Sequence, residues 1–275
     1  MCAALQEVMT IVHETYEGVA SPMTSYALLN AAKLQSYALQ AGGIASLFIG
    51  ISSAKPVRDK RLEFFRESGS GYSITAFFLA ICSVSTLEYA IDITIAALLA
   101  IWIRSTILQG ILSFIVHCIF LSWTASAWGL FYSTWVAPGT VFLVVGLHMV
   151  ISMFLCGAAS SVTFEDFSKQ GPEYKAINAI TGLIAPVRFF VESYVVIEEM
   201  CLPPQSGFTS DTLSLMNRTG FKVNGYAPND PNVPLRSCGG WYWNVLPMFL
   251  VGFTIRFISL IILHSVNRKK MPKTP

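Results

Sequence analysis

Charged residues are distributed very unevenly along this chain. Sixty consecutive residues, 105–164, contain no Asp, Glu, Lys or Arg. A helix needs about 20 apolar residues to cross the hydrocarbon core of a bilayer, so this stretch is long enough for two crossings. Ala137, Pro138 and Gly139 mark the break between them, because Pro and Gly interrupt helices.

Other charge-poor stretches extend the same pattern. It predicts an all-α fold, a polytopic membrane helical bundle of about five transmembrane helices, at 27–53, 72–103, 106–133, 140–162 and 242–266. A further apolar stretch, 176–197, is interrupted by Pro186, Arg188 and Glu192. We interpret it as a re-entrant or interfacial helix, because irregular backbone at membrane depth must be shielded by protein.

The composition strengthens the prediction of a membrane protein. Charged residues make up 12% of the 275 residues, against roughly 25% in ordinary globular domains. Hydrophobic residues make up 53%, and the mean hydropathy is +0.57. These values exclude a disordered chain and a soluble enzyme. A net charge of +2 is too small for a surface that follows nucleic-acid phosphates, so we expect membrane lipid and no nucleic acid as a partner.

Basic residues in short loops predict the orientation, because such loops face the cytosol. They cluster after the first span and after the last span, at 55–66 and 268–273. Five spans then place the N-terminus outside. The predicted organisation is an external segment at 1–26, a bundle at 27–200 with a cytosolic turn at 55–70, an external loop at 201–240, a last transmembrane helix at 241–266 and a cytosolic tail at 267–275.

Residues 1–24 do not resemble a signal peptide, since no basic segment precedes an apolar core. An external N-terminus without a signal leads us to expect that the chain begins within a larger protein. The external loop carries Cys201 and Cys238, which we expect to form a disulfide; free thiols and an intermolecular bridge are the alternatives. Asn217 begins an Asn-Arg-Thr sequon in the same loop and is a candidate glycosylation site, or a chance match.

The second and the last predicted span contain charged residues, Glu88 and Asp92 in the second and Arg256 in the last. Glu88 and Asp92 are four residues apart and therefore share one helix face. Carboxylates at depth are costly and usually face a bundle interior or water. We expect Glu88 to be buried and partnered, with Arg256 of the last span as a candidate partner; an interfacial position is the alternative. Gly42, Ser46 and Gly50 predict the close approach of another helix, or are ordinary membrane-helix composition.

Catalytic and metal-binding motifs are not found. The sequence has no GxSxG, HExxH, paired CxxC or GxxxxGK[ST] motif, so we expect no enzyme activity, and ATP with magnesium only through an associated domain. Cys118, His148 and Cys156 lack the short spacing of metal ligands, so no metal site is predicted. Cysteines within spans, including Cys82, are expected to be small packing residues.

The turn after the first predicted span contains the most specific sequence motif. Its segments Phe64-Phe65-Arg66-Glu67-Ser68, Ser70-Gly71-Tyr72-Ser73 and Ala76-Phe77-Phe78-Leu79-Ala80 resemble the entry to the third membrane helix in the ABCG (white) subfamily of ABC transporters. The segment Pro186–Ser193, with Pro186 and Glu192, is similar to the external re-entrant stretch of that family. The resemblance extends from about residue 13 to the C-terminal end.

The resemblance implies a transmembrane domain without the nucleotide-binding domain and the first helix of the family. It also implies a role for the cytosolic turn, which in the family couples nucleotide-domain closure to the membrane helices. The residues that would carry coupling are Leu62, Phe64, Phe65, Arg66, Glu67 and Gly71. The alternative is a solvated turn that only orients the helix. Ile81, Ser85 and Gly69 depart from the family pattern.

The function implied is ATP-driven export of a lipid, sterol or other hydrophobic compound. The chain would work in the plasma membrane as a homo- or heterodimer with another half-transporter and with a nucleotide-binding domain. Spans 27–53 and 140–162 would line the substrate path, with Phe48, Phe142, Met149 and Met153 as possible contacts, or as packing residues. The alternatives are a regulatory or scaffolding subunit that lacks the nucleotide-binding domain, and an unrelated channel or membrane-embedded enzyme.

Overall fold

The computed structural model describes residues 31–68, 73–104, 111–156, 183–200 and 242–270. Every regular element in these ranges is an α-helix, and they contain no strand. In chain order the helices are α3 (Ala31–Ser68), α4 (Ile74–Arg104), α5 (Ile111–Trp135), α6 (Val141–Leu155), α9 (Pro186–Met200) and α11 (Tyr242–Lys270). The all-α prediction is confirmed for this part of the chain.

Four of these helices are long and apolar enough to cross a bilayer. Their apolar segments are Tyr37–Lys60, Ile74–Ala100, Phe114–Trp135 and Val245–Ser265. This is the character of a multi-pass integral membrane protein. The predicted span 140–162 begins with α6, an apolar helix of 15 residues and about 22 Å. Residues 157–162 lie outside the described ranges, so the fifth crossing stays a prediction.

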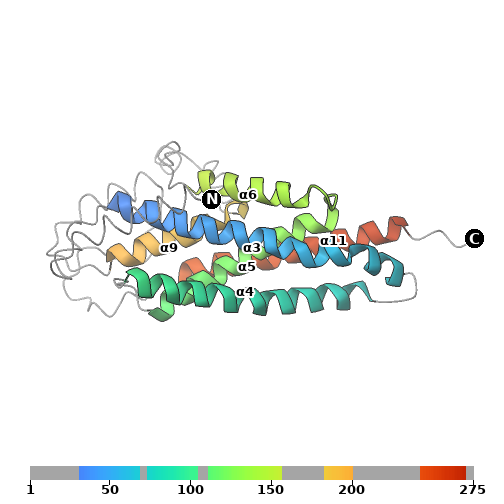
Figure 1. Cartoon of the computed structure of the whole chain (residues 1–275), viewed down its shortest axis with the longest axis horizontal. Helices are drawn as coiled ribbons and strands as arrows, with labels where there is room; N and C mark the ends of the chain where they lie inside the picture. The colour runs from blue at the N-terminus through green and yellow to red at the C-terminus, as the bar shows by residue number, and fades with distance from the viewer. Residues whose placement is uncertain (1–30, 69–72, 105–110, 157–182, 201–241, 271–275) are drawn as a thin grey trace, which may run out of the picture.

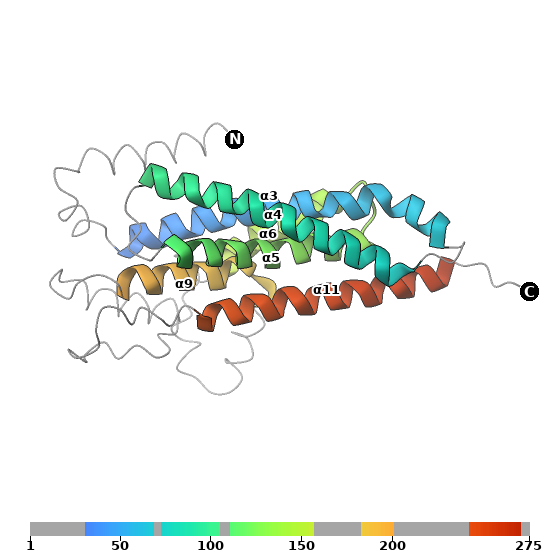
Figure 2. The same cartoon turned by 90° about the horizontal axis from the view of Figure 1, so that it is seen from below.

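Helix α5 lies at the centre of the bundle (Figures 1 and 2). It packs against each of the other five described helices. In an apolar stretch of 18 residues within α5, 67% of the residues are buried, against 22% in such a stretch of α4, which lies at the edge. The sequence of α5 fits this position, because it has no charged residue and is apolar on all sides.

The two basic clusters lie at the same end of the molecule. Both views show the C-terminal ends of α3 and α11 close to one end of the bundle (Figures 1 and 2). Residues 55–66 and 268–270 therefore lie at one end of the bundle, whereas 271–273 lie outside the described residues and the side of the membrane stays a prediction. The predicted break at 137–139 is also confirmed, since α5 ends at Trp135 and α6 begins at Val141.

The segment predicted as a cytosolic turn at 55–70 differs from the prediction. Helix α3 continues through Pro56 and ends at Ser68, so 55–68 is helical rather than a turn. Proline removes one backbone donor, but the residues that follow it are mostly Arg, Lys, Leu and Glu, which favour helix. Leu62, Phe64, Phe65, Arg66 and Glu67 therefore belong to the last turns of α3, while Gly71 lies outside the described residues.

Glycines allow the central helices to approach one another closely. A Cβ atom added to Gly129 of α5 would clash with the carbonyl oxygen of Gly50 and with Oγ of Ser53, both in α3. A Cβ on Gly50 would come 2.7 Å from the terminal methyl of Met149 in α6, and one on Gly42 would come 2.6 Å from the ring of Phe190 in α9. The small residues predicted in the first span therefore do permit close packing.

Candidate functional site

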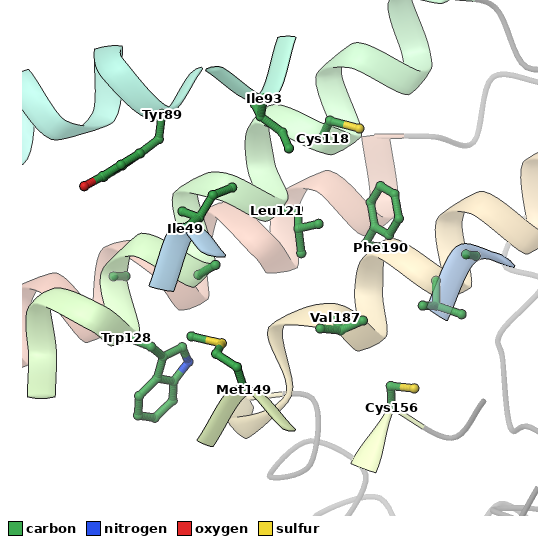
Figure 3. Packing of buried hydrophobic residues seen from close by; sticks show 14 of the residues in the cluster. Ile49, Tyr89, Ile93, Cys118, Leu121, Trp128, Met149, Cys156, Val187 and Phe190 are labelled. Carbon is green, nitrogen blue, oxygen red and sulfur yellow. The ribbon is translucent and has the colours of Figure 1, made fainter. Parts of the chain in front are cut away.

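A groove lies between α3 and α4. These two helices make few contacts with each other, while both pack extensively against α5. The space between them is a cavity of about 740 Å³, which we call the α3–α4 groove. Its base is formed by Phe114, Cys118 and Leu121 of α5, and Phe190 of α9 closes one side. Figure 3 shows Cys118, Leu121 and Phe190 among the buried side chains of this region.

Small side chains create this space. Ala41 and Ala45 of α3, together with Ala96, Ala97 and Ala100 of α4, line the groove towards the N-terminal end of α3. A methyl side chain leaves a gap where a leucine would fill the distance between the two helices. The groove is open to the outside of the bundle, and the remainder of its lining is mostly apolar.

Large apolar side chains complete the lining. Phe48 and Ile44 line the groove from α3, and Phe48 remains 59% exposed. From α4, Tyr89 and Ile93 point towards α5 (Figure 3) and are both buried. An exposed aromatic ring beside an apolar cavity is a surface that apolar compounds or lipid chains can contact.

Three charged residues line one part of the groove. They are Lys55 of α3 and Glu88 and Asp92 of α4, and all three are exposed. Glu88 is close to the middle of the apolar segment Ile74–Ala100. Lys55 and Glu88 each lie about 20 Å along their helix from the connection between α3 and α4, which places them at a similar level. Among the described residues, no ion pair joins Lys55 to either carboxylate.

The expectation of a buried Glu88 paired with Arg256 is wrong in this structure. Glu88 faces the groove, while Arg256 is buried between α11 and α5. The partners of Arg256 are not acidic. Its Nη1 donates to the carbonyl oxygen of Trp123 at 2.8 Å and to that of Gly252 at 3.2 Å, and its Nη2 donates to Oγ of Ser126 at 2.8 Å.

The guanidinium of Arg256 also lies over an aromatic ring. Its central carbon is 3.5 Å from the centroid of the Trp123 ring, which is a cation–π geometry. Trp123 stacks on Phe249 of α11, and its indole nitrogen donates to the Phe249 carbonyl oxygen at 3.2 Å. Arg256 therefore joins α11 to α5 through the hydrogen bonds of its two terminal nitrogens and through stacking, without a carboxylate, while its Nε has no hydrogen-bond partner among the described residues.

The four apolar residues predicted to contact a substrate have different positions. Phe48 lines the groove, but Met149 is fully buried and packs against Gly50. Met153 packs against Gly43, so both methionines fill the contact between α3 and α6. The guanidinium carbon of Arg58 lies 4.2 Å from the centroid of the Phe142 ring, so Phe142 links the start of α6 to the C-terminal half of α3.

An aromatic cluster holds α5 against α6. It contains Trp128, Phe131, Tyr132 and Trp135 of α5 and His148 of α6. The ring centroids of Trp128 and His148 are 4.4 Å apart. The hydroxyl of Tyr132 shares a hydrogen bond of 3.2 Å with Nδ1 of His148. His148 is therefore a packing residue whose Nδ1 has a hydrogen-bond partner in Tyr132.

Replacing Tyr132 with Phe should lower stability, because the ring stays and only its bond to His148 is lost. The expected loss is about 1 kcal/mol in the free energy of unfolding. Thermal unfolding of Tyr132→Phe, His148→Leu and the double variant would measure the coupling between the two side chains. Strictly additive effects of the two substitutions would contradict this assignment.

The predicted re-entrant stretch is helical from Pro186 onwards. Pro186 is the first residue of α9, where its fixed φ and missing donor are tolerated. Arg188 is 3% exposed and Glu192 7% exposed, although both are charged, and Glu192 acts electrostatically on Arg188 one turn away. Helix α9 contacts α3, α5, α6 and α11, so this pair lies inside the bundle.

Several predicted residues cannot be placed. Cys201, Cys238 and Asn217 lie outside the described residues, as Gly71 does. Cys82, Cys118 and Cys156 are buried, and the thiol of Cys156 donates to the carbonyl oxygen of Met153 at 3.0 Å. Within the described part of the chain, no group of three His, Cys, Asp or Glu side chains is arranged to hold a metal ion.

No protein-family model and no curated protein matches this sequence.

Proposed function

We propose that this chain is the membrane domain of an exporter of hydrophobic compounds, of the kind found in the ABCG subfamily that its sequence resembles. The observation that carries the proposal is the α3–α4 groove. A cavity of about 740 Å³ is within the range of small-molecule sites, and its lining is mostly apolar. It opens between two helices that are each long enough to cross a bilayer, which suits a compound that arrives from the lipid.

We extend the proposal to a fifth crossing, a dimer partner and a nucleotide-binding domain. Residues 140–162 form the fifth crossing, and α9 is a re-entrant or interfacial helix on the external side. The chain works in the plasma membrane as a homo- or heterodimer with another half-transporter. A nucleotide-binding domain, joined to it or carried by a partner, supplies ATP hydrolysis and magnesium. The substrate is a lipid, a sterol or another hydrophobic compound.

The cytosolic end of α3 is the proposed coupling element. Its residues Leu62–Glu67 continue the same helix that lines the groove, so a push at this end acts directly on the groove lining. Arg58, stacked over Phe142, connects the same region to α6. A helix whose last turns contain both apolar and charged residues is suited to docking another domain.

The test begins with the full chain, affinity-purified in mild detergent from cells that express it naturally. We expect an ATP-binding chain to copurify and the complex to hydrolyse ATP. Reconstituted in vesicles, the complex should move a fluorescent sterol or a fluorescent phospholipid only when ATP is present. Replacing both Phe64 and Phe65 with Ala should abolish this movement while assembly is retained, and Lys60→Gln, at an exposed position on the same helix, is the matched control.

The results separate the proposal from its alternatives. A complex whose ATP hydrolysis rises when this chain is removed would identify a regulatory subunit. A complex without an ATP-binding chain and without ATP-dependent movement of either compound would overturn the proposal.

A further inference from the structure

The α3–α4 groove contains two carboxylates from one membrane-length helix, α4. Glu88 and Asp92 lie in the apolar segment Ile74–Ala100, where an unpaired charge is expensive. Neither forms an ion pair with any described residue, and the buried cation Arg256 is bound to α5 instead. Both carboxylates line the cavity, so a positively charged group in the groove would lie beside them.

We infer that the α3–α4 groove is a binding site for a hydrophobic cation, a molecule that combines one ammonium group with an apolar body. The charges of the lining favour this class. Two carboxylates and the single ammonium of Lys55 leave one net negative charge in the groove. An anionic amphiphile would meet two like charges, whereas a monocation restores neutrality.

The positions of the two acids suit one shared ammonium group. Glu88 and Asp92 are four residues apart on α4, so their Cβ atoms are about 5–6 Å apart on one face. An ammonium group between the two carboxylates can donate a charge-assisted hydrogen bond to each. The buried hydroxyl-bearing side chain of Tyr89 lies between them in sequence and also lines the groove.

The rest of the groove suits the apolar body of the ligand. From the acids towards the N-terminal end of α3, the lining is formed by Ile44, Ala45, Ala97 and Phe114. The groove thus has a charged region and an apolar region, separated along its length. This polarity matches an amphiphile with one charged end. Because Phe48 and Ile44 are exposed beside the opening, the ligand enters sideways from the lipid.

This inference rests on the proposed function in so far as it names a ligand class for the same groove, but binding needs no ATP and no transport, so a failure of binding and a failure of export can be told apart. The test uses the purified full chain in nanodiscs of phosphatidylcholine, which carries no net charge. The probe is radiolabelled hexadecylammonium, whose –NH3+ head can donate hydrogen bonds, and its saturable binding is measured in a proximity assay. Hexadecanol and hexadecyl sulfate, with the same tail and a neutral or anionic head, serve as competitors.

We expect saturable binding near one probe per chain, displaced by unlabelled probe but not by either competitor. The double variant Glu88→Gln/Asp92→Asn should bind the probe at least about tenfold more weakly, the loss expected for hydrogen bonds to charged groups. Asp59→Asn, at an exposed position near the cytosolic end of α3, is the matched control and should bind normally. Ala96→Trp fills the groove from an exposed position and should also abolish binding.

Several results would overturn the inference. Equal displacement by hexadecanol would mean that the groove contacts lipid chains without recognising charge. Normal binding by both the double variant and Ala96→Trp would place the probe elsewhere. Absence of saturable binding in the wild-type chain would mean that another segment, or a second copy of the chain, already covers the groove.

Discussion

Replacing Gly129 with Ala is expected to destabilise the protein by about 3 kcal/mol or more. The new methyl group would meet the backbone of α3 at Gly50, and backbone cannot turn aside as a flexible side chain can. Insertion of extra atoms into a packed core commonly costs about 1–3 kcal/mol, and here the two helices with the most extensive contact must separate. Thermal unfolding in detergent, followed by size-exclusion chromatography, would measure the loss.

The sign of this effect distinguishes close packing from helix propensity. Gly to Ala within a helix normally stabilises it by about 1 kcal/mol. Gly129→Ala should therefore act in the opposite direction to the intrinsic preference. Gly146→Ala is the matched control, because Gly146 lies within α6 and a Cβ there would meet no atom closer than 3.9 Å. A gain in stability from Gly129→Ala would show that α3 and α5 are not in close contact at Gly50.

Reversal of the charge at Arg256 is the second large effect expected. In Arg256→Glu a buried carboxylate would face the carbonyl oxygen of Trp123 and the negative face of its ring. An uncompensated buried charge costs about 3–5 kcal/mol, so we expect little folded protein in a detergent extract. The yield of monodisperse protein and its unfolding temperature are the measurements.

The variant Arg256→Met distinguishes the effect of losing the charge from the effect of losing the packing of the side chain. Methionine has similar length and carries no charge, and replacement of buried ionic groups by apolar residues of similar volume is often nearly neutral. We therefore expect a far smaller loss than with Glu. Lys60→Glu makes the same change of charge at an exposed position on α3 and should have little effect. Equal damage from Met and Glu would contradict a role that depends on charge.

The sequence allowed the helices to be predicted better than their contacts. The charge-free run 105–164 and the Pro-Gly break are local signals, so α5 and the start of α6 could be located within a few residues. Gly129 lies in the same run without any periodic pattern, because its role depends on which helix lies opposite. The groove was missed for the same reason: alanines mark a cavity only once their helices are placed.

The error at Arg256 has a physical cause. A search of the sequence for a partner looks for opposite charge, and Glu88 was the obvious acid in a neighbouring span. The guanidinium instead uses carbonyl oxygens, a serine hydroxyl and an indole ring, all of which are too common to stand out in a sequence. The end of α3 was misjudged because Pro56 and a basic cluster usually mark the end of a helix.

The central position of α5 has a consequence for biosynthesis. As the chain is made, α3 and α4 are synthesised before α5, and these two helices make few contacts with each other. Helix α5, which packs against both, is made later, and α11 later still. Until α5 is made, α3 and α4 are therefore expected to associate only loosely. Helix α5 is the element whose arrival allows assembly, and damage to it should be recognised by quality control at that step.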